Sequence, residues 1–227
     1  MQAVIVTDQV EDRDYLGMVL RQAGVAVVRS SDLAGIGPLV QAHDIDLILL
    51  APVDEAQLAA DVAAIREVTQ VPLLLLSDSL TEAFHCHLLD AGADLVIPRP
   101  YAPRLLARYA KMLLRRAGAS ATAFLPIIEA NRIALDPATR SVQVNGRKAE
   151  RLTPLEFRLL YLLMTNAGQV LSVDLIVERV WGYSGEGNRE LVRGLVRRLR
   201  RKIEPSPNQP LYIHNLPGVG YRFTEQL

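Results

Sequence analysis

The residues with the clearest chemical pattern are arginines near the C-terminal end of the chain. Arg193, Arg197 and Arg201 recur at every fourth position, so they share one side of a helix. Between positions 189 and 202 there are seven basic residues, and Glu190 is the only acid. Like charges at this spacing repel one another, and a polyanion would offset that repulsion. The pattern predicts a nucleic-acid-binding face, with a solvated charged face as the alternative.

Apolar residues define the other side of the same helix. At 100° per residue one arc collects Leu191, Val192, Leu195, Val196, Leu199 and Ile203. Such an arc has to face a core. The pattern predicts a helix from about residue 188 to residue 203, ended by Pro205.

Two shorter helices and several strands must position this face. Thr153 and Glu156 have capping-box spacing around Pro154, and Ser172 can cap a second helix. Before the helices, short β-branched runs are separated by turn signals such as Asn145-Gly146. After them, residues 211 to 223 predict a terminal hairpin. We expect an α+β unit made of a small antiparallel sheet, three helices and a β-hairpin.

Length and charge indicate two domains. The 227 residues exceed most single compact units. Residues 1 to 120 carry ten basic and fifteen acidic side chains, a formal charge of −5, whereas the remainder carries +5. The basic half is the candidate partner of a polyanion. The single cysteine and the short apolar runs favour a cytoplasmic protein without a membrane span.

The first half alternates short apolar runs with helical segments. The strands are expected at 3–7, 25–28, 46–50, 71–77 and 95–98, with about four helices between them. This alternation predicts a doubly wound five-stranded parallel sheet, an α/β fold. Ligands of such sheets bind beyond the carboxyl ends of the strands, where the sequence has Thr7, Asp8, Ala51, Ser77 and Arg99.

The order and spacing of residues 1 to 118 resemble the CheY-like receiver domain. In that family an Asp after the third strand accepts a phosphoryl group, and acids after the first strand hold Mg²⁺. Here Ala51 stands at the acceptor position and Thr7 at the first acidic position, while Asp8 retains the second. Ser77 retains the hydroxyl position, and Arg99 replaces the lysine that precedes a cis-proline. Because phosphoryl transfer needs a nucleophile and several metal ligands, we expect no Asp phosphorylation, metal or cofactor. An ion pair between Arg99 and Asp8 is a further hypothesis.

The second half resembles the winged helix-turn-helix domain of OmpR/PhoB-type regulators. The match covers residues 125 to 225 and includes Thr-Pro-Leu-Glu-Phe (153–157), Val-Trp-Gly (180–182), Glu-Pro (204–205) and Gly-Val-Gly-Tyr-Arg-Phe (218–223). It implies that the third helix enters the major groove of double-stranded DNA. The DNA-contacting residues expected from this resemblance are Arg193, Arg197, Arg198, Arg200, Arg201, Asn215 and Arg222.

Within that set the resemblance assigns different roles. Arg198 matches a position that reaches bases, where a bidentate contact to guanine discriminates by about 1–3 kcal/mol. Arg197 and Arg200 match phosphate-contacting positions. Asn215 and Arg222 lie in the wing, where Pro217 stands in place of a frequent arginine.

The resemblance also implies protein partners. In this family the fourth helix, fifth strand and fifth helix of the receiver form a homodimer interface. Here Arg104, Arg108 and Lys111 could pair with Asp90 and Asp94 of a second copy, although a solvated charged face explains them equally well. The loop from residue 183 to residue 187 is a candidate contact for RNA polymerase.

Together these observations predict a non-enzymatic, sequence-specific transcription regulator that acts independently of Asp phosphorylation. The expected domains are a receiver-like domain at 1–118, a linker at 119–124 and a winged helix-turn-helix domain at 125–227. The alternative is a ligand-controlled regulator that binds a small metabolite in the receiver pocket. An enzyme using the same pocket is less favoured, because the sequence has no Gly-rich phosphate loop and no paired nucleophile and base.

Overall fold

The computed structural model describes residues 1–33, 35–52, 55–79, 81–117, 126–183 and 189–224. The chain separates into two compact units, Met1–Ala117 and Gly118–Leu227, and each is described by itself. The linker expected at 119–124 lies outside the described residues. Among the described helices, none has the length and apolar character needed to cross a membrane.

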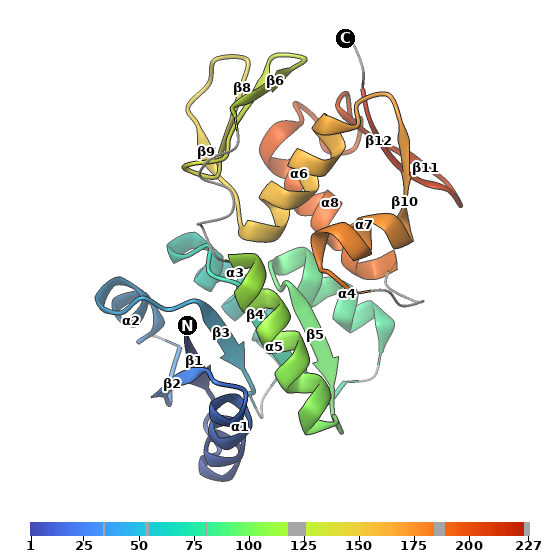
Figure 1. Cartoon of the computed structure of the whole chain (residues 1–227). Coiled ribbons are helices and arrows are strands. Elements are labelled where there is room, and N and C mark those ends of the chain that lie inside the picture. The colour runs from blue at the N-terminus through green and yellow to red at the C-terminus, as the bar shows by residue number, and fades with distance from the viewer. Residues whose placement is uncertain (34, 53–54, 80, 118–125, 184–188, 225–227) are drawn as a thin grey trace. The chain divides into compact units, whose positions relative to one another are not determined.

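The first unit contains the predicted five-stranded parallel sheet (Figure 1). Its strands are β1 (Gln2–Val6), β2 (Ala26–Ser30), β3 (Leu47–Leu50), β4 (Leu73–Ser77) and β5 (Leu95–Pro98). The spatial order is β2-β1-β3-β4-β5. Every residue of β3 and β4 is buried, as expected for central strands covered on both faces.

The described residues of this unit contain the four helices expected between the strands and a fifth helix after β5. They are α1 (Val10–Gln22), α2 (Ile36–Ala42), α3 (Leu58–Val68), α4 (Glu82–Ala91) and α5 (Pro103–Ala117). Helices α1 and α5 contact each other on one face, and α3 contacts both α2 and α4. The chain order reverses between β1 and β3, which defines a switch point at the carboxyl end of the sheet.

The second unit begins with an antiparallel sheet of β6 (Ile128–Ala130), β7 (Ile133–Asp136), β8 (Ser141–Val144) and β9 (Glu150–Arg151). Asn145 and Gly146 connect β8 to the segment before β9 with φ angles of 51° and 70°. Both values are positive, so the Asn-Gly pair forms the type of tight turn that its residues predict.

Three helices follow, and two sheets flank them (Figure 1). The helices are α6 (Pro154–Thr165), α7 (Val173–Val180) and α8 (Arg189–Ile203). The capping box of α6 is confirmed, because Thr153 Oγ1 accepts from Glu156 N and Glu156 Oε2 accepts from Thr153 N. Ser172 caps α7 through Leu175 N.

The terminal hairpin is part of a three-stranded sheet. Strands β11 (Ile213–Leu216) and β12 (Gly220–Phe223) form the predicted hairpin, and β10 (Val170–Ser172) pairs with the other edge of β12. The close pairing requires glycine at position 220, because a Cβ there would overlap the Leu171 carbonyl. The sequence did not reveal β10, since three residues form a strand only when a distant partner is present.

Candidate functional site

Helix α8 presents one charged face and one buried face. Arg193, Arg197 and Arg201 are exposed, whereas the apolar arc is buried, with Leu195 and Leu199 almost inaccessible. The exposed arginines repeat every fourth residue and therefore form a continuous row. The exposed row corresponds to the basic helix face that the sequence pattern predicts.

Arg198 does not belong to this exposed row, and its expected contact with DNA bases stays a prediction. Its side chain is only 8% exposed, and its Nε lies 3.7 Å from the carboxylate of Glu156 on α6. The sequence does contain a signal for this placement. Position 198 lies seven residues after Leu191 and three after Leu195, so it falls within the apolar arc.

The buried carboxylate of Glu156 pairs with two cationic side chains, Arg198 and Lys202. Lys202 Nζ lies 2.7 Å from Glu156 Oε2, in addition to the ion pair with Arg198. Burial by itself raises the pKa of Glu156. The charges of Lys202 and Arg198, with hydrogen bonds from Lys202 and Thr153 N, outweigh burial and hold the pKa below its ordinary value. This cluster joins α6 to α8 and thereby orients the arginine row.

Arg200, expected to contact phosphates, has a hydrogen-bond partner within the second unit. The guanidinium is half-buried, and its Nη2 donates to the Ile213 carbonyl at 2.7 Å. This bond ties α8 to β11. This bond positions the hairpin, and the phosphate contact expected of Arg200 stays a prediction.

The two expected wing residues lie on opposite faces of the hairpin. Asn215 is paired with Tyr221, whereas Arg222 is paired with His214, and directly paired residues share a face. Burial raises the pKa of Tyr221, while the nearby charges of Arg200 and Arg193 lower it. The structure thus places Asn215 on the face of the hairpin that carries Tyr221, and Arg222 on the opposite face.

Sequence reasoning missed the residue that anchors this hairpin. Glu204 is 6% exposed and accepts hydrogen bonds from the amides of Leu211 (2.7 Å), Tyr212 (3.0 Å) and Ile213 (2.9 Å). An acid directly after the end of α8 is disfavoured by the helix dipole. Its presence there was a signal that the carboxylate has local partners.

The expected receiver pocket lies at the carboxyl edge of the first unit's sheet. Thr7, Ala51 and Ser77 are buried, and Asp8 is exposed. Close to the switch point is a cavity of 220 Å³. Its lining consists of Val6, Thr7, Asp8, Ser31, Asp32, Leu33, Leu50, Pro52, Leu58 and Asp61.

Arg99 does not pair with Asp8, and that hypothesis is corrected. Its Nη2 lies 2.6 Å from Asp12 and its Nη1 lies 3.3 Å from Asp78. Asp12 lies in the first turn of α1. Burial and the charge of Asp12 raise the pKa of neighbouring Tyr101 to about 12, although Arg99 opposes the shift. The peptide bond after Arg99 is cis, as the resemblance implies.

The Ser77 hydroxyl also has a hydrogen-bond partner in the same chain, Glu55. It donates to Glu55 Oε2 at 3.2 Å, and the next amide, Asp78 N, donates to Glu55 Oε1 at 2.6 Å. The receiver pocket therefore has a neutral Ala51 in place of an acceptor, and its hydroxyl and cation are bound to carboxylates of the same chain. Within the part of the chain that the structure describes, no cluster of three His, Cys, Asp or Glu residues is arranged to hold a metal ion.

The expected dimer residues divide into two groups. Asp94 is 1% exposed, its Oδ2 lies 2.7 Å from Arg66 Nη2, and the same oxygen accepts from Leu73 N. Its expected pairing with a second copy is corrected, because the buried carboxylate pairs with Arg66 and Leu73 N of the same chain. Asp90 is half-buried.

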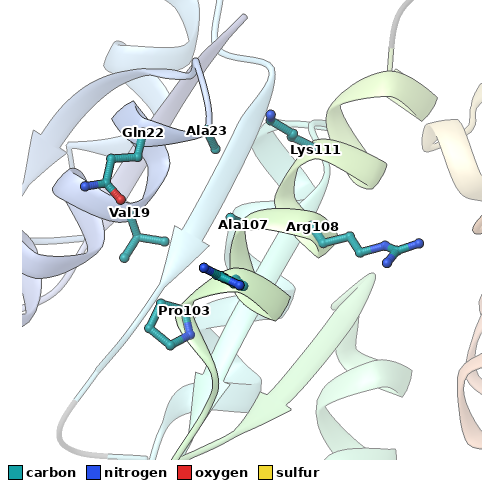
Figure 2. A pocket seen from close by; sticks show the side chains of 8 residues that line it. Val19, Gln22, Ala23, Pro103, Ala107, Arg108 and Lys111 are labelled. Carbon is teal, nitrogen blue, oxygen red and sulfur yellow. The ribbon is translucent and has the colours of Figure 1, made fainter.

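The basic residues expected at the dimer interface are exposed along α5. Arg104, Arg108 and Lys111 line a hollow of 390 Å³ between α1 and α5, together with Val19, Gln22, Ala23, Pro103 and Ala107. Figure 2 shows Lys111 directed toward Ala23, which follows α1, whereas the Arg108 side chain extends away from α1. Of the candidate polymerase loop, Tyr183 is described, and residues 184–187 lie outside the described residues.

Comparison with known proteins gives matches over both units. The family model described as "Transcriptional regulatory protein, C terminal" matches residues 147–223. KDP operon transcriptional regulatory protein KdpE of Escherichia coli is 30% identical over 221 residues, which are 97% of each chain. DNA-binding response regulator MtrA of Mycobacterium tuberculosis is 31% identical over 222 residues, or 96% of this chain and 95% of the relative.

A solved structure has the same fold over the full length. A RitR mutant aligns with a TM-score of 0.78 and 20% sequence identity over 99% of each chain. The receiver-like sheet and the winged helix-turn-helix order are thus found together in a known structure, and the identity to KdpE extends over both units. The chain belongs to the OmpR/PhoB-type response regulators.

Proposed function

We propose that this protein is a sequence-specific, double-stranded-DNA-binding regulator of transcription that acts without phosphorylation of an Asp. The observation that carries the proposal is the exposed row Arg193, Arg197 and Arg201 on α8, a helix held rigidly from its buried side. Regularly spaced guanidinium groups on an exposed helix suit the phosphates and base edges of a major groove. The relative MtrA is a DNA-binding response regulator, which supports the same partner for this chain.

Independence from phosphorylation is supported by the chemistry of the receiver pocket. Ala51 has no nucleophile, and its side chain is fully buried. Arg99 is paired with Asp12 and Asp78, and Ser77 donates to Glu55. At the positions that the resemblance assigns to the phosphoryl group, the acceptor is therefore missing, and the hydroxyl and the cation already bind carboxylates of the same chain.

The test is fluorescence anisotropy with the full chain on a site first enriched by genome-wide chromatin binding, without any phosphodonor. We expect Arg197→Ala to weaken binding about 5- to 100-fold and to reduce the salt slope by about one unit. The matched control is Arg147→Ala, which removes an equally exposed arginine from the turn after β8. Equal binding by Arg197→Ala and wild type would exclude the α8 face as the interface. Binding that appears only with acetyl phosphate would exclude phosphate independence.

We further propose that the protein binds DNA as a homodimer, through the surface formed by α4, β5 and α5. Arg108 extends from α5 away from α1, and Asp90 on α4 supplies an acid for a second copy. Sedimentation of Arg108→Glu on and off a two-site duplex tests this surface. We expect the variant to lose cooperative binding to two half-sites about one helical turn apart, and unchanged cooperativity would exclude this surface. The loop at 183–187 remains the proposed contact for RNA polymerase.

The second candidate function is control by a small ligand in the receiver pocket. The 220 Å³ cavity at the switch point favours it, because open α/β sheets bind ligands at that position. A thermal-shift screen against a metabolite panel tests this candidate. Stabilisation of the first unit by a compound would support it, since a ligand that binds only the folded state raises its stability, and no stabilisation across the panel would weigh against it.

A further inference from the structure

Two hydrogen-bond donors at the carboxyl end of β4 converge on one carboxylate. The Ser77 hydroxyl and the Asp78 amide each bind a different oxygen of Glu55, at 3.2 and 2.6 Å. The Ser77 side chain is fully buried. Its oxygen also accepts from Ser79 N at 3.2 Å, so its proton is left to point toward Glu55. A hydroxyl and an amide aimed at the same acceptor make a small oxyanion site.

This site is continuous with the beginning of α4. The Ser79 hydroxyl is 3.0 Å from Thr81 Oγ1 and accepts from Thr81 N. The Ser79 carbonyl is 2.7 Å from His85 Nε2 in the first turns of the helix. The positions of residues 77–79 and 81–85 therefore depend on the orientation that Glu55 imposes on Ser77.

The same site is linked to α1 and β5 by charge. Asp78, whose amide binds Glu55, pairs through its side chain with Arg99, and Arg99 pairs with Asp12 at the start of α1. Two acids, Asp78 and Asp12, thus share the Arg99 guanidinium, and the Asp78 amide connects this ion-pair cluster to Glu55 in the segment before α3. Loss of the Glu55 carboxylate would remove the acceptor at one end of this network.

We propose that Ser77 and Asp78 form an oxyanion site that the chain fills with its own Glu55 carboxylate, and that this resident anion holds residues 77–79 and 81–85 in one conformation. The inference deepens the proposed phosphorylation-independent function and rests on it, because a resident carboxylate makes an added anion unnecessary. Glu55 is a positioning residue, and the surface whose geometry it sets is the N-terminal end of α4.

The test is hydrogen exchange, measured by mass spectrometry on the full chain, for Glu55→Ala and Glu55→Gln. Each lost hydrogen bond to a charged acceptor corresponds to about tenfold or more in local opening. We expect amides from Ser77 to His85 to exchange at least about tenfold faster in Glu55→Ala, and by a smaller factor in Glu55→Gln, whose amide oxygen still accepts one bond. The matched control is Glu67→Ala, which removes an exposed acid from α3 and should leave the exchange of this segment unchanged.

Rescue by a free anion distinguishes an oxyanion site from simple packing. Acetate added to Glu55→Ala should occupy the two donors and restore protection between Ser77 and His85, whereas the same concentration of chloride should restore less. Unchanged exchange in Glu55→Ala, or faster exchange that acetate does not reverse, would overturn the inference.

The DNA-binding measurement separates this inference from the function on which it rests. Wild type that binds DNA without a phosphodonor, together with unchanged exchange in Glu55→Ala, would refute the oxyanion site and leave the proposed function standing. Wild type that binds no DNA would refute the proposed function, and the acetate rescue would still decide whether the oxyanion site exists.

Discussion

Replacing Glu156 with glutamine should separate the charge of this buried side chain from its shape. Glu156→Gln can still accept from Thr153 N, but it removes the carboxylate that pairs with Lys202 at 2.7 Å and Arg198 at 3.7 Å. Loss of one partner of a buried ion pair costs about 3–5 kcal/mol. Lys202 is 22% exposed and can turn toward water, so we expect the lower end, about 3 kcal/mol.

The assay is urea unfolding followed by the fluorescence of Trp181, the single tryptophan of the chain. Trp181 is 1% exposed and lies in the second unit, so its signal reports that unit. A loss of about 3 kcal/mol lowers the urea midpoint by about 1–3 M at an unchanged slope. The control Glu178→Gln removes an exposed acid from α7 and should change stability by less than about 0.5 kcal/mol. A loss below about 1 kcal/mol in Glu156→Gln would refute the charge-based reasoning.

The same variant should alter the pH dependence of unfolding. The folded state holds the pKa of Glu156 below its ordinary value. A lowered folded pKa contributes stability that is complete above the unfolded pKa, about 4.3, and is lost as the pH falls through the folded value. The difference in stability between wild type and Glu156→Gln should therefore be largest near neutral pH and narrow below about pH 4. A difference that stays constant across this range would contradict the assignment.

Three other variants test separate contacts. Glu204→Ala leaves three hairpin amides without their acceptor. It should lower the free energy of unfolding by about 3 kcal/mol in the same urea assay and speed hydrogen exchange in β11. A change below about 1 kcal/mol would contradict the anchoring role. Asp94→Asn should destabilise the first unit by about 3 kcal/mol in circular-dichroism unfolding, whereas Asp44→Asn, at an exposed position, should have almost no effect. Hydrogen bonds from the Thr139 side chain and the Ala138 amide hold the pKa of Asp136 below its ordinary value. Thr139→Ala should therefore raise the pKa of Asp136 in an NMR titration. An unchanged pKa would exclude the contribution of the Thr139 side chain.

The sequence by itself determined the elements whose signals are local. The capping box at Thr153 and Glu156, the Asn145-Gly146 turn and the amphipathic arc of α8 each depend on residues within one helix or turn, and the structure contains all three. Alternation of apolar runs with helical segments was sufficient to predict a parallel sheet, because the connection between parallel neighbours leaves few other arrangements.

Only the tertiary structure decided which charged residues face solvent and which pair inside the fold. Arg198 is buried against Glu156, Arg99 pairs with Asp12 rather than Asp8, and Asp94 is enclosed with Arg66. The partners in these pairs are separated by 42, 87 and 28 positions in the sequence. Charge pairing is set by distance in space and by burial, and neither quantity is contained in residue types and spacing along one segment. Local patterns therefore predicted the helix that carries the arginines, whereas long-range packing determined which of those arginines are exposed and which are buried.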